Sequence, residues 1–258
     1  MLEPFPPPHV AGMELAGVID AAGPGSGWSA GERVMAIVLP LRREGGAQAE
    51  LVVVPADSVA PVPAGATVEQ AATLPMNGLT VRYALDMLGL AAGSTLAVTG
   101  AAGAVGGYAI ELGKVDGLIV VADAAPADEL LIRGLGADVV VPRGEGCAAA
   151  IREAFPDGVD AVIDAALLHT TILPAVRDGG AVAAVRQFEG SSERGITIHH
   201  VLVRDYATNQ AALAELGRLA ETGRITLRVA EALPPERAAE AHRRLEAGGV
   251  RGRLVIAF

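Results

Sequence analysis

The sequence has little cysteine, few aromatic residues and a shortage of positive charge. Of its 258 residues, Cys147 is the only cysteine, and 3% are aromatic. A single cysteine excludes an intramolecular disulfide and a cysteine cluster for structural zinc, which fits a cytoplasmic protein. Thirty acidic residues against 20 basic ones give a formal charge of −10. Because nucleic acids are bound through basic surfaces, we expect no nucleic-acid partner.

Long hydrophobic runs are also missing. Charges and glycines interrupt every apolar run before it reaches the roughly 18 residues of a transmembrane helix. The start, "MLEPFPPP", has neither the basic region nor the apolar core of a signal peptide. We therefore expect a soluble protein with no membrane partner. Since 51% of the residues are apolar, a core of Ala, Val, Leu and Ile is expected.

Two kinds of patterning divide the chain. Residues 10–63 are short extended runs between turn signals, which predict β-rich structure. Helical spacing begins at Thr67 and is broken by Pro75 and Asn77-Gly78, where we expect a hinge between two units. From 95 to 204, apolar strands alternate with helical segments, a rhythm typical of a parallel sheet covered by helices. The expected helices begin near 105 and span 127–135, 147–155, 170–178 and 210–222, with one more after Pro234-Pro235 and before the final strand.

The stretch "AVTGAAGAVGGYAIELGK" at 97–114 joins the first buried strand to a helix. Glycines leave the backbone N–H groups open at the positive end of the helix, where a pyrophosphate binds. Gly100 and Gly103 would form the turn and the close approach, and Gly106 would let the helix lie against the strand. The alternative to a phosphate site is an ordinary tight strand-to-helix connection, for which any α/β protein can use glycine.

Asp123 closes the next apolar run, "LIVVAD". A carboxylate there accepts hydrogen bonds from the adenosine ribose and repels a 2′-phosphate. The following "AAPADE" has no basic residue, and the next one along the chain is Arg133. The sequence therefore predicts NAD(P)H as cofactor, with NAD favoured. The alternative is that Asp123 caps the following helix.

Five segments carry a family resemblance. They are "PHVAGMELAGVIDAAGPGSGWSAGERV", "GGAQAELVVVPADSVAPVPAG", "AATLPMNGLTVRYAL", "VTGAAGAVGG" and the final "AAEAHRRLEAGGVRGRLVIAF". In order and spacing, the chain resembles the medium-chain dehydrogenase/reductase superfamily, and within it the zinc-independent quinone oxidoreductase-like branch. The likeness covers nearly the whole chain. Relatives begin with additional residues, so the N-terminus is read as shortened.

The resemblance implies an α/β fold in which a doubly wound Rossmann parallel sheet is inserted in a shortened GroES-like β-rich catalytic domain. The expected domains are 1–76, catalytic; 77–208, Rossmann; and 209–258, the last Rossmann helix and the return to the catalytic domain. The nicotinamide would lie in a cleft near Asn77, Gly78 and Thr80. The phosphate turn would be lined by Thr99, Ala101, Ala104 and Val105. Relatives are commonly homodimers joined at sheet edges, and "ITIHHVLV" is read as an edge strand or an internal one.

Zinc-dependent relatives carry His-Glu where this chain has Met13-Glu14, and its five histidines are scattered. No credible set of zinc ligands is present, so we expect no metal. The resemblance implies hydride transfer from NAD(P)H to a small-molecule quinone or α,β-unsaturated carbonyl, with no catalytic side chain identified. The alternatives are a carbonyl or alcohol oxidoreductase, and a dinucleotide-binding sensor or interaction protein with little turnover, which the short start motivates.

Overall fold

The computed structural model describes residues 9–258. They form two compact units. The first unit consists of the chain up to Leu79 together with Val203–Phe258, and the second unit is Thr80–Leu202. The expected boundaries were 76/77 and 208/209, so the helix expected to end the Rossmann domain lies in the first unit instead. Its Gln210 amide donates to the Val59 carbonyl at 2.9 Å, which ties it to that unit. The residues behind the signal-peptide expectation, 1–8, lie outside the described range.

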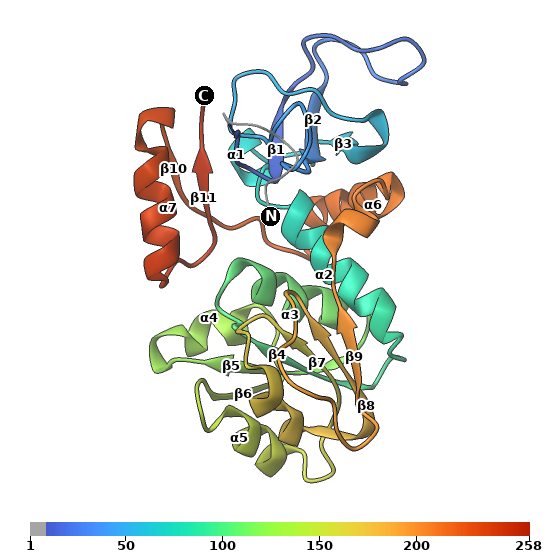
Figure 1. Ribbon diagram of the computed structural model, residues 1–258, viewed down its shortest axis with the longest axis vertical. Helices are drawn as coiled ribbons and strands as arrows, with labels where there is room; N and C mark the ends of the chain where they lie inside the picture. Colours follow the sequence, from blue (N-terminus) through green and yellow to red (C-terminus); the bar gives the residue numbers. More distant parts are fainter. Residues whose placement is uncertain (1–8) are drawn as a thin grey trace. The chain divides into compact units, whose positions relative to one another are not determined.

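The first unit contains two small sheets (Figure 1). An antiparallel sheet has the order β1 (Glu14–Val18), β2 (Arg33–Ile37), β3 (Val59–Pro61), and a parallel pair joins β10 (Val229–Leu233) to β11 (Arg253–Ile256). The helices of this unit are α1 (Val68–Ala71), α6 (Gln210–Glu221) and α7 (Ala238–Ala247). Four of the five β2 residues are buried, because both faces of this strand are covered.

Helix α2 (Pro75–Leu88) begins in the first unit and ends in the second. Pro75 is its first residue, a position where the missing N–H costs nothing. The helix runs unbroken through Asn77-Gly78, so the break expected there was wrong. Close packing explains the glycine, since a Cβ on Gly78 would lie 2.8 Å from the Leu74 side chain and 3.1 Å from Leu216.

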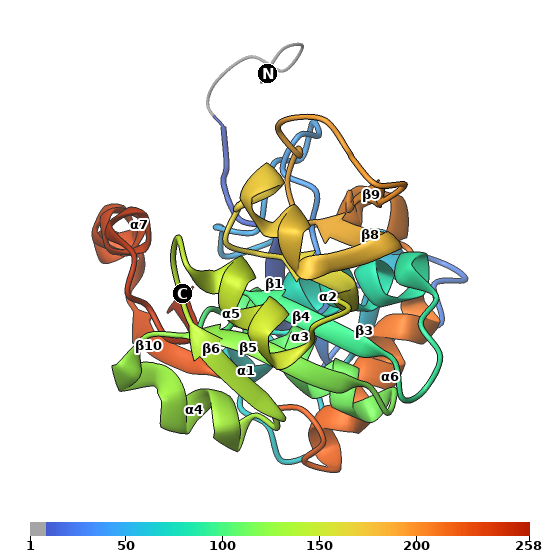
Figure 2. The ribbon, with the colours of Figure 1, turned by 90° about the horizontal axis from the view of Figure 1, so that it is seen from below.

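The second unit is a six-stranded parallel sheet with helices, in the order β6-β5-β4-β7-β8-β9. Figure 1 labels all six strands, and Figure 2 shows the sheet from below. The strands are β4 (Thr95–Thr99), β5 (Ile119–Ala124), β6 (Val139–Pro142), β7 (Val159–Asp164), β8 (Val176–Ala184) and β9 (Thr197–His200). The helices are α3 (Ala104–Val115), α4 (Glu129–Gly134) and α5 (Cys147–Ala154). The chain builds outward from β4 to β6 and then returns to the other side of β4. The strand order therefore reverses between β4 and β7, where open α/β sheets bind ligands.

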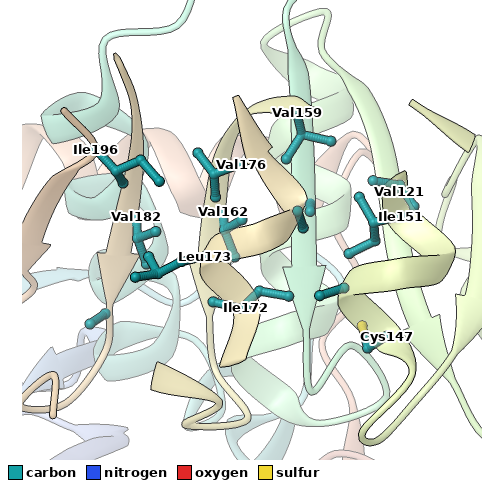
Figure 3. Close-up of a cluster of buried hydrophobic side chains, with 14 of the residues drawn as sticks. Val121, Cys147, Ile151, Val159, Val162, Ile172, Leu173, Val176, Val182 and Ile196 are labelled. Carbon is teal, nitrogen blue, oxygen red and sulfur yellow. The ribbon is translucent and has the colours of Figure 1, made fainter. Parts of the chain in front are cut away.

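The side chains of alternate strand residues point to opposite faces of this sheet. Figure 3 shows Val121 and Val162 in one buried cluster with Ile151 of α5 and Ile172. On the other face, Leu96 and Val120 approach α3, where a Cβ on Gly113 would lie 3.2 and 3.1 Å from their side chains. The sheet is thus buried on both faces, as its continuous apolar strands predict.

The helix expected at 170–178 was wrong in type and extent. Residues 169–175 form a 3-10 helix containing Pro174, and β8 begins at Val176. Proline removes a backbone donor, and the β-branched residues before it disfavour an α-helix. Among residues 9–258, no helix has both the length and the apolar character needed to cross a membrane.

Candidate functional site

The three glycines after β4 have separate structural roles. Gly100 has φ +65°, a left-handed conformation that favours glycine. Gly103 is the N-cap of α3, and its N–H donates to the Gly100 carbonyl at 3.0 Å. A Cβ on Gly106 would lie 2.4 Å from the Gly100 oxygen and 2.5 Å from the Ala101 Cα. The turn and the helix therefore meet closely because Gly106 has no side chain.

The N-terminus of α3 is open to a ligand. No side chain caps this 12-residue helix, and Ala104 and Val105 in its first turn are only partly buried. Free backbone N–H groups at the positive end of a helix bind anions such as a pyrophosphate. The residues of this turn therefore fit the diphosphate of a dinucleotide.

Asp123 lies in β5, and its side chain is directed at the glycine turn. The residue is 5% exposed, and its Oδ1 accepts a hydrogen bond from the Ala101 N–H at 2.9 Å. The next helical turn has Ala125 as its N-cap, so Asp123 does not cap it. The structure brings the predicted acid and the predicted turn together within one unit.

Asp164, which sequence reasoning missed, links the ends of β4 and β7. It is 1% exposed, and its Oδ1 accepts a hydrogen bond from the Thr99 hydroxyl at 2.6 Å. The same hydroxyl accepts the Ala166 N–H at 3.1 Å. A Cβ on Gly100 would meet the Ala165 carbonyl at 3.1 Å. Thr99 is fully buried and holds the neighbouring loop in place, while the backbone of the turn remains the part open to a ligand.

The loop after β7 is strained and anchored. Leu167 has φ 59° and His169 has φ 53°, conformations that are uncommon outside glycine and cluster at functional sites. The Asp164 carboxylate accepts the backbone N–H groups of Leu168 and His169 at 3.1 and 2.9 Å. The His169 ring accepts the Glu189 N–H at 3.2 Å through Nδ1. These contacts fix the loop beside the glycine turn at the switch point of the sheet.

Cys147 is the first residue of α5 and packs in the buried apolar cluster of the second unit. Burial raises the pKa of its thiol to about 12, with smaller contributions from the charges of Asp123 and Asp164. The side chain is 1% exposed and belongs to the apolar cluster of Figure 3. It is a core residue that remains a neutral thiol.

The residues expected near the nicotinamide lie in α2. Asn77 belongs to the first unit and is 2% exposed, and its amide donates to the Thr73 carbonyl at 3.5 Å. Thr80 is the first residue of the second unit and is 6% exposed. Their contact with a cofactor stays a prediction.

The residues that the structure describes do not fit a zinc centre. Within residues 9–258, no group of three or more His, Cys, Asp and Glu side chains is placed to hold a metal ion. Glu14, the motif acid, accepts the Met76 N–H at 2.9 Å and forms an ion pair with Arg253. Burial raises the pKa of this carboxyl, and the Arg253 charge partly offsets the effect. Its Oε2 therefore contacts the start of α2, and its Oε1 is paired with the arginine of β11.

Comparisons with known proteins identify related families. Residues 2–64 match the family model of the alcohol dehydrogenase GroES-like domain, and residues 135–256 match that of the zinc-binding dehydrogenases. A crystal structure of a probable oxidoreductase from Mycobacterium abscessus has a TM-score of 0.84 and 30% identity, covering 98% of this chain and 81% of that one.

Two relatives come from Arabidopsis thaliana. A chloroplast envelope quinone oxidoreductase homolog is 30% identical over 64% of this chain and 53% of the relative. A chloroplastic NADPH-dependent alkenal/one oxidoreductase is 32% identical over 70% of this chain and 47% of the relative. Four polyketide synthases also match, and the chain spans only 3–10% of their length. With the GroES-like match over residues 2–64, the dehydrogenase match over residues 135–256 and a similar solved structure along almost its full length, the chain belongs to the medium-chain dehydrogenase/reductase superfamily.

Proposed function

We propose that the protein is an NAD(P)(H)-dependent oxidoreductase that transfers hydride to a small-molecule quinone or α,β-unsaturated carbonyl. The observation that carries the proposal is the glycine turn, with its uncapped α3 N-terminus and Asp123 bonded to the turn. The names of the Arabidopsis relatives, a quinone oxidoreductase homolog and an alkenal/one oxidoreductase, support this choice of acceptor.

The chain's own residues bind and orient the cofactor in this proposal. The backbone N–H groups of Ala104 and Val105 hold the diphosphate, and the Asp123 carboxylate accepts from a ribose hydroxyl. Asp164 and Thr99 keep the β7 loop against the turn. Asn77 and Thr80 would hold the nicotinamide end. When bound, the nicotinamide supplies the hydride, and the protein contributes position and exclusion of water.

The test combines binding with turnover. Purified protein is titrated with NADH and with NADPH by fluorescence, and oxidation of each is followed with a panel of quinones and enones. Saturable binding and acceptor-dependent oxidation are expected. Binding without turnover on any acceptor favours the dinucleotide-binding sensor, whereas folded protein that binds neither nucleotide contradicts the proposal.

The preference between cofactors has its own test at Asp123. A carboxylate there favours NAD because it repels a 2′-phosphate. Asp123→Ser should therefore raise the affinity for NADP relative to NAD. An unchanged ratio of the two dissociation constants would remove Asp123 from this role.

The edge strand β9 supports a further proposal, a homodimer. Strand β9 pairs only with β8 in the described sheet, and an unpaired strand edge can accept another strand. Sedimentation velocity of the wild type should give twice the chain mass, and a monomer at all concentrations would contradict it.

A further inference from the structure

A large apolar groove lies within the first unit. It has a volume of about 1080 Å³ and is lined along β1, along β11 with the two residues that follow it, and along the chain at 47–54. All of its lining residues belong to the first unit, and Figure 1 labels both strands. We call it the β1 groove. Its volume is at the upper end of small-molecule sites, which measure roughly 300–1,000 Å³, so it has room for a short polypeptide segment.

The core of the antiparallel sheet lines the β1 groove. Val34, Ala36 and Val59 are the buried residues of this core and all three line the groove. The partly buried side chains packed against them line it as well: Leu15, Ile19, Trp28 and Val54. Four large apolar side chains of the lining are more than half exposed: Val18, Leu51, Val53 and Phe258. Exposed apolar surface of this extent marks an interaction site.

The groove runs along the free edge of β1. All five residues of β1 line it, and consecutive side chains of a strand point to opposite faces, so a groove that meets all five lies along the strand edge. The Met13 carbonyl accepts from Val38 and the Ile19 N–H donates to Glu32, so β2 bonds to these two residues and to every second residue between them. Alternation directs the backbone groups of three residues away from β2: Glu14, Ala16 and Val18. None of the interactions found in residues 9–258 engages those backbone groups.

Two more extended segments along the groove have unpaired backbone groups. Strand β11 pairs only with β10 in the described sheets, and the N–H groups of Arg253 and Ala257 donate to the β10 side, so Leu254 and Ile256 lie on the opposite edge. The segment 51–54 is Leu-Val-Val-Val and belongs to no strand. Its N–H groups are likewise unengaged within residues 9–258. Because an unpaired strand edge is a template for another strand, the groove is suited to an extended polypeptide.

The charges along the groove are acidic. Asp20, Glu50 and Glu69 line it, and among the described lining residues the only arginine or lysine is Arg253, which is paired with Glu14. Asp20 and Glu50 are exposed and form no ion pair within residues 9–258. A basic segment is therefore attracted to the groove, whereas a second copy of this chain, with its formal charge of −10, is repelled.

We propose that the β1 groove binds an extended, basic segment of another protein, which pairs with β1 as an additional strand and places alternate apolar side chains in the groove. Main-chain hydrogen bonds supply the affinity in this mode of recognition, and the alternate side chains supply the specificity. The five residues of β1 span roughly 17 Å at about 3.4 Å per residue, so the paired part of the partner is about five residues long. The inference does not rest on the proposed function, because the groove shares no residue with the glycine turn.

The probe is a synthetic peptide in which valine and threonine alternate, with two lysines at each end. Its binding to the wild type is measured by isothermal titration calorimetry and by tryptophan emission, because Trp28 is the only tryptophan of the chain and lines the groove. We expect saturable binding, a change in the Trp28 emission, and an affinity that falls as the salt concentration rises.

The controls separate strand pairing, charge and position. A peptide with N-methylated valines lacks backbone donors, and one with glutamates in place of lysines has the opposite charge; each should bind about tenfold more weakly or worse. Val18→Lys places a charge in the apolar lining and should weaken binding of the lysine peptide by a similar factor. Leu130→Lys, at an exposed position of α4 in the second unit, should bind it like the wild type. Circular dichroism of the three proteins should coincide, because both substituted side chains are exposed.

Three results would overturn the inference. The first is folded wild type that shows no saturable binding of the lysine peptide. The second is equal binding of the N-methylated peptide, which would exclude strand pairing, or equal binding by Val18→Lys, which would place the peptide outside the groove. The third is a sedimentation mass that falls from dimer to monomer in Val18→Lys, which would assign the groove to a second copy of the chain. Nucleotide binding is measured separately, so failure of the proposed function would leave this inference standing.

Discussion

Gly106 shows how one missing side chain determines the geometry of the turn. Gly106→Ala would place a Cβ 2.4 Å from the backbone oxygen of Gly100, so α3 or the turn must shift. Overpacking of this kind costs about 1–3 kcal/mol. We expect a lower midpoint of thermal unfolding and weaker binding of both dinucleotides.

Gly134 provides the matched control for that substitution. It ends α4, and a Cβ there would meet no atom within 4 Å. Gly134→Ala should therefore retain wild-type binding and keep or slightly raise the stability. Equal losses of stability and binding from the two substitutions would show that close approach at Gly106 does not explain the result.

The thiol of Cys147 gives a second prediction at this scale. Its pKa is raised to about 12, mainly by burial, so almost no thiolate, the reactive form, exists near neutral pH. Native protein at pH 8 should not react with a chromogenic disulfide reagent over minutes. Unfolded protein should react at its one cysteine and release one equivalent of the coloured thiol. Rapid reaction of the native protein would contradict the buried position.

Sequence reasoning at the residue scale finds what neighbours in the chain determine. The glycine turn and Asp123 follow from a strand, a turn and the next strand, and the structure brings them together. Asp164 was missed because its position depends on which strands pair. It lies beside Thr99 only because β7 pairs with β4.

At the scale of elements, the loop after β7 is held in a strained conformation. Leu167 has φ 59°, and a left-handed conformation costs a non-glycine residue about 1–2 kcal/mol. Leu167→Gly relieves this strain while adding flexibility to the unfolded chain at a cost of roughly 0.5–1 kcal/mol. We expect urea unfolding to show unchanged stability or a gain of up to about 1 kcal/mol.

The same substitution in a helix provides the comparison. Leu130 lies in α4 and is 85% exposed, so little packing is lost there. Leu130→Gly should destabilise by roughly 0.5–1 kcal/mol, the usual penalty of glycine in a helix. If both variants lose stability equally, Leu167 is not strained.

Elements were predicted best where one pattern dominates. The apolar strands and the helix after the glycine turn follow directly from hydrophobic periodicity. The segment 170–178 failed because its apolar residues fit a helical period while Pro174 and three preceding β-branched residues favour a 3-10 turn. At Pro75 the same residue type starts α2 instead of breaking it, a distinction that depends on where the first helical turn falls.

At the scale of the whole molecule, the sequence predicts domain boundaries at 76/77 and 208/209, and the compact units of the structure divide at Leu79/Thr80 and Leu202/Val203. Helix α6 buries Leu213, Leu216 and Gly217, and its place in the first unit depends on long-range contacts such as that of Gln210 with Val59. Distant segments also meet at Glu14 and Arg253, which join β1 to β11 within the first unit.

This ion pair yields a prediction about pH. Glu14 is 5% exposed, and Arg253→Met would leave its charge buried without a partner, a loss of about 3 kcal/mol in the free energy of unfolding at pH 8. Burial already raises the pKa of Glu14, and removal of the cation raises it further. A group with a raised native pKa binds more protons when folded, so its contribution to stability falls as pH rises through that pKa.

The cost of Arg253→Met should therefore shrink between pH 8 and pH 5, because Glu14 takes up a proton. Hydrogen bonds and ion pairs lower the pKa values of Asp138 and Asp160 despite partial burial. Both carboxyls therefore stay ionised throughout this range and do not make the stability depend on pH. Urea unfolding of wild type, Arg253→Met and the double variant Glu14→Gln/Arg253→Met at each pH measures the effect. The double variant has no carboxyl at position 14, so its stability relative to wild type should vary less with pH than that of the single variant. A cost of Arg253→Met that is equal at pH 5 and pH 8 would mean that Arg253 stabilises the first unit by packing, not by neutralising a buried charge.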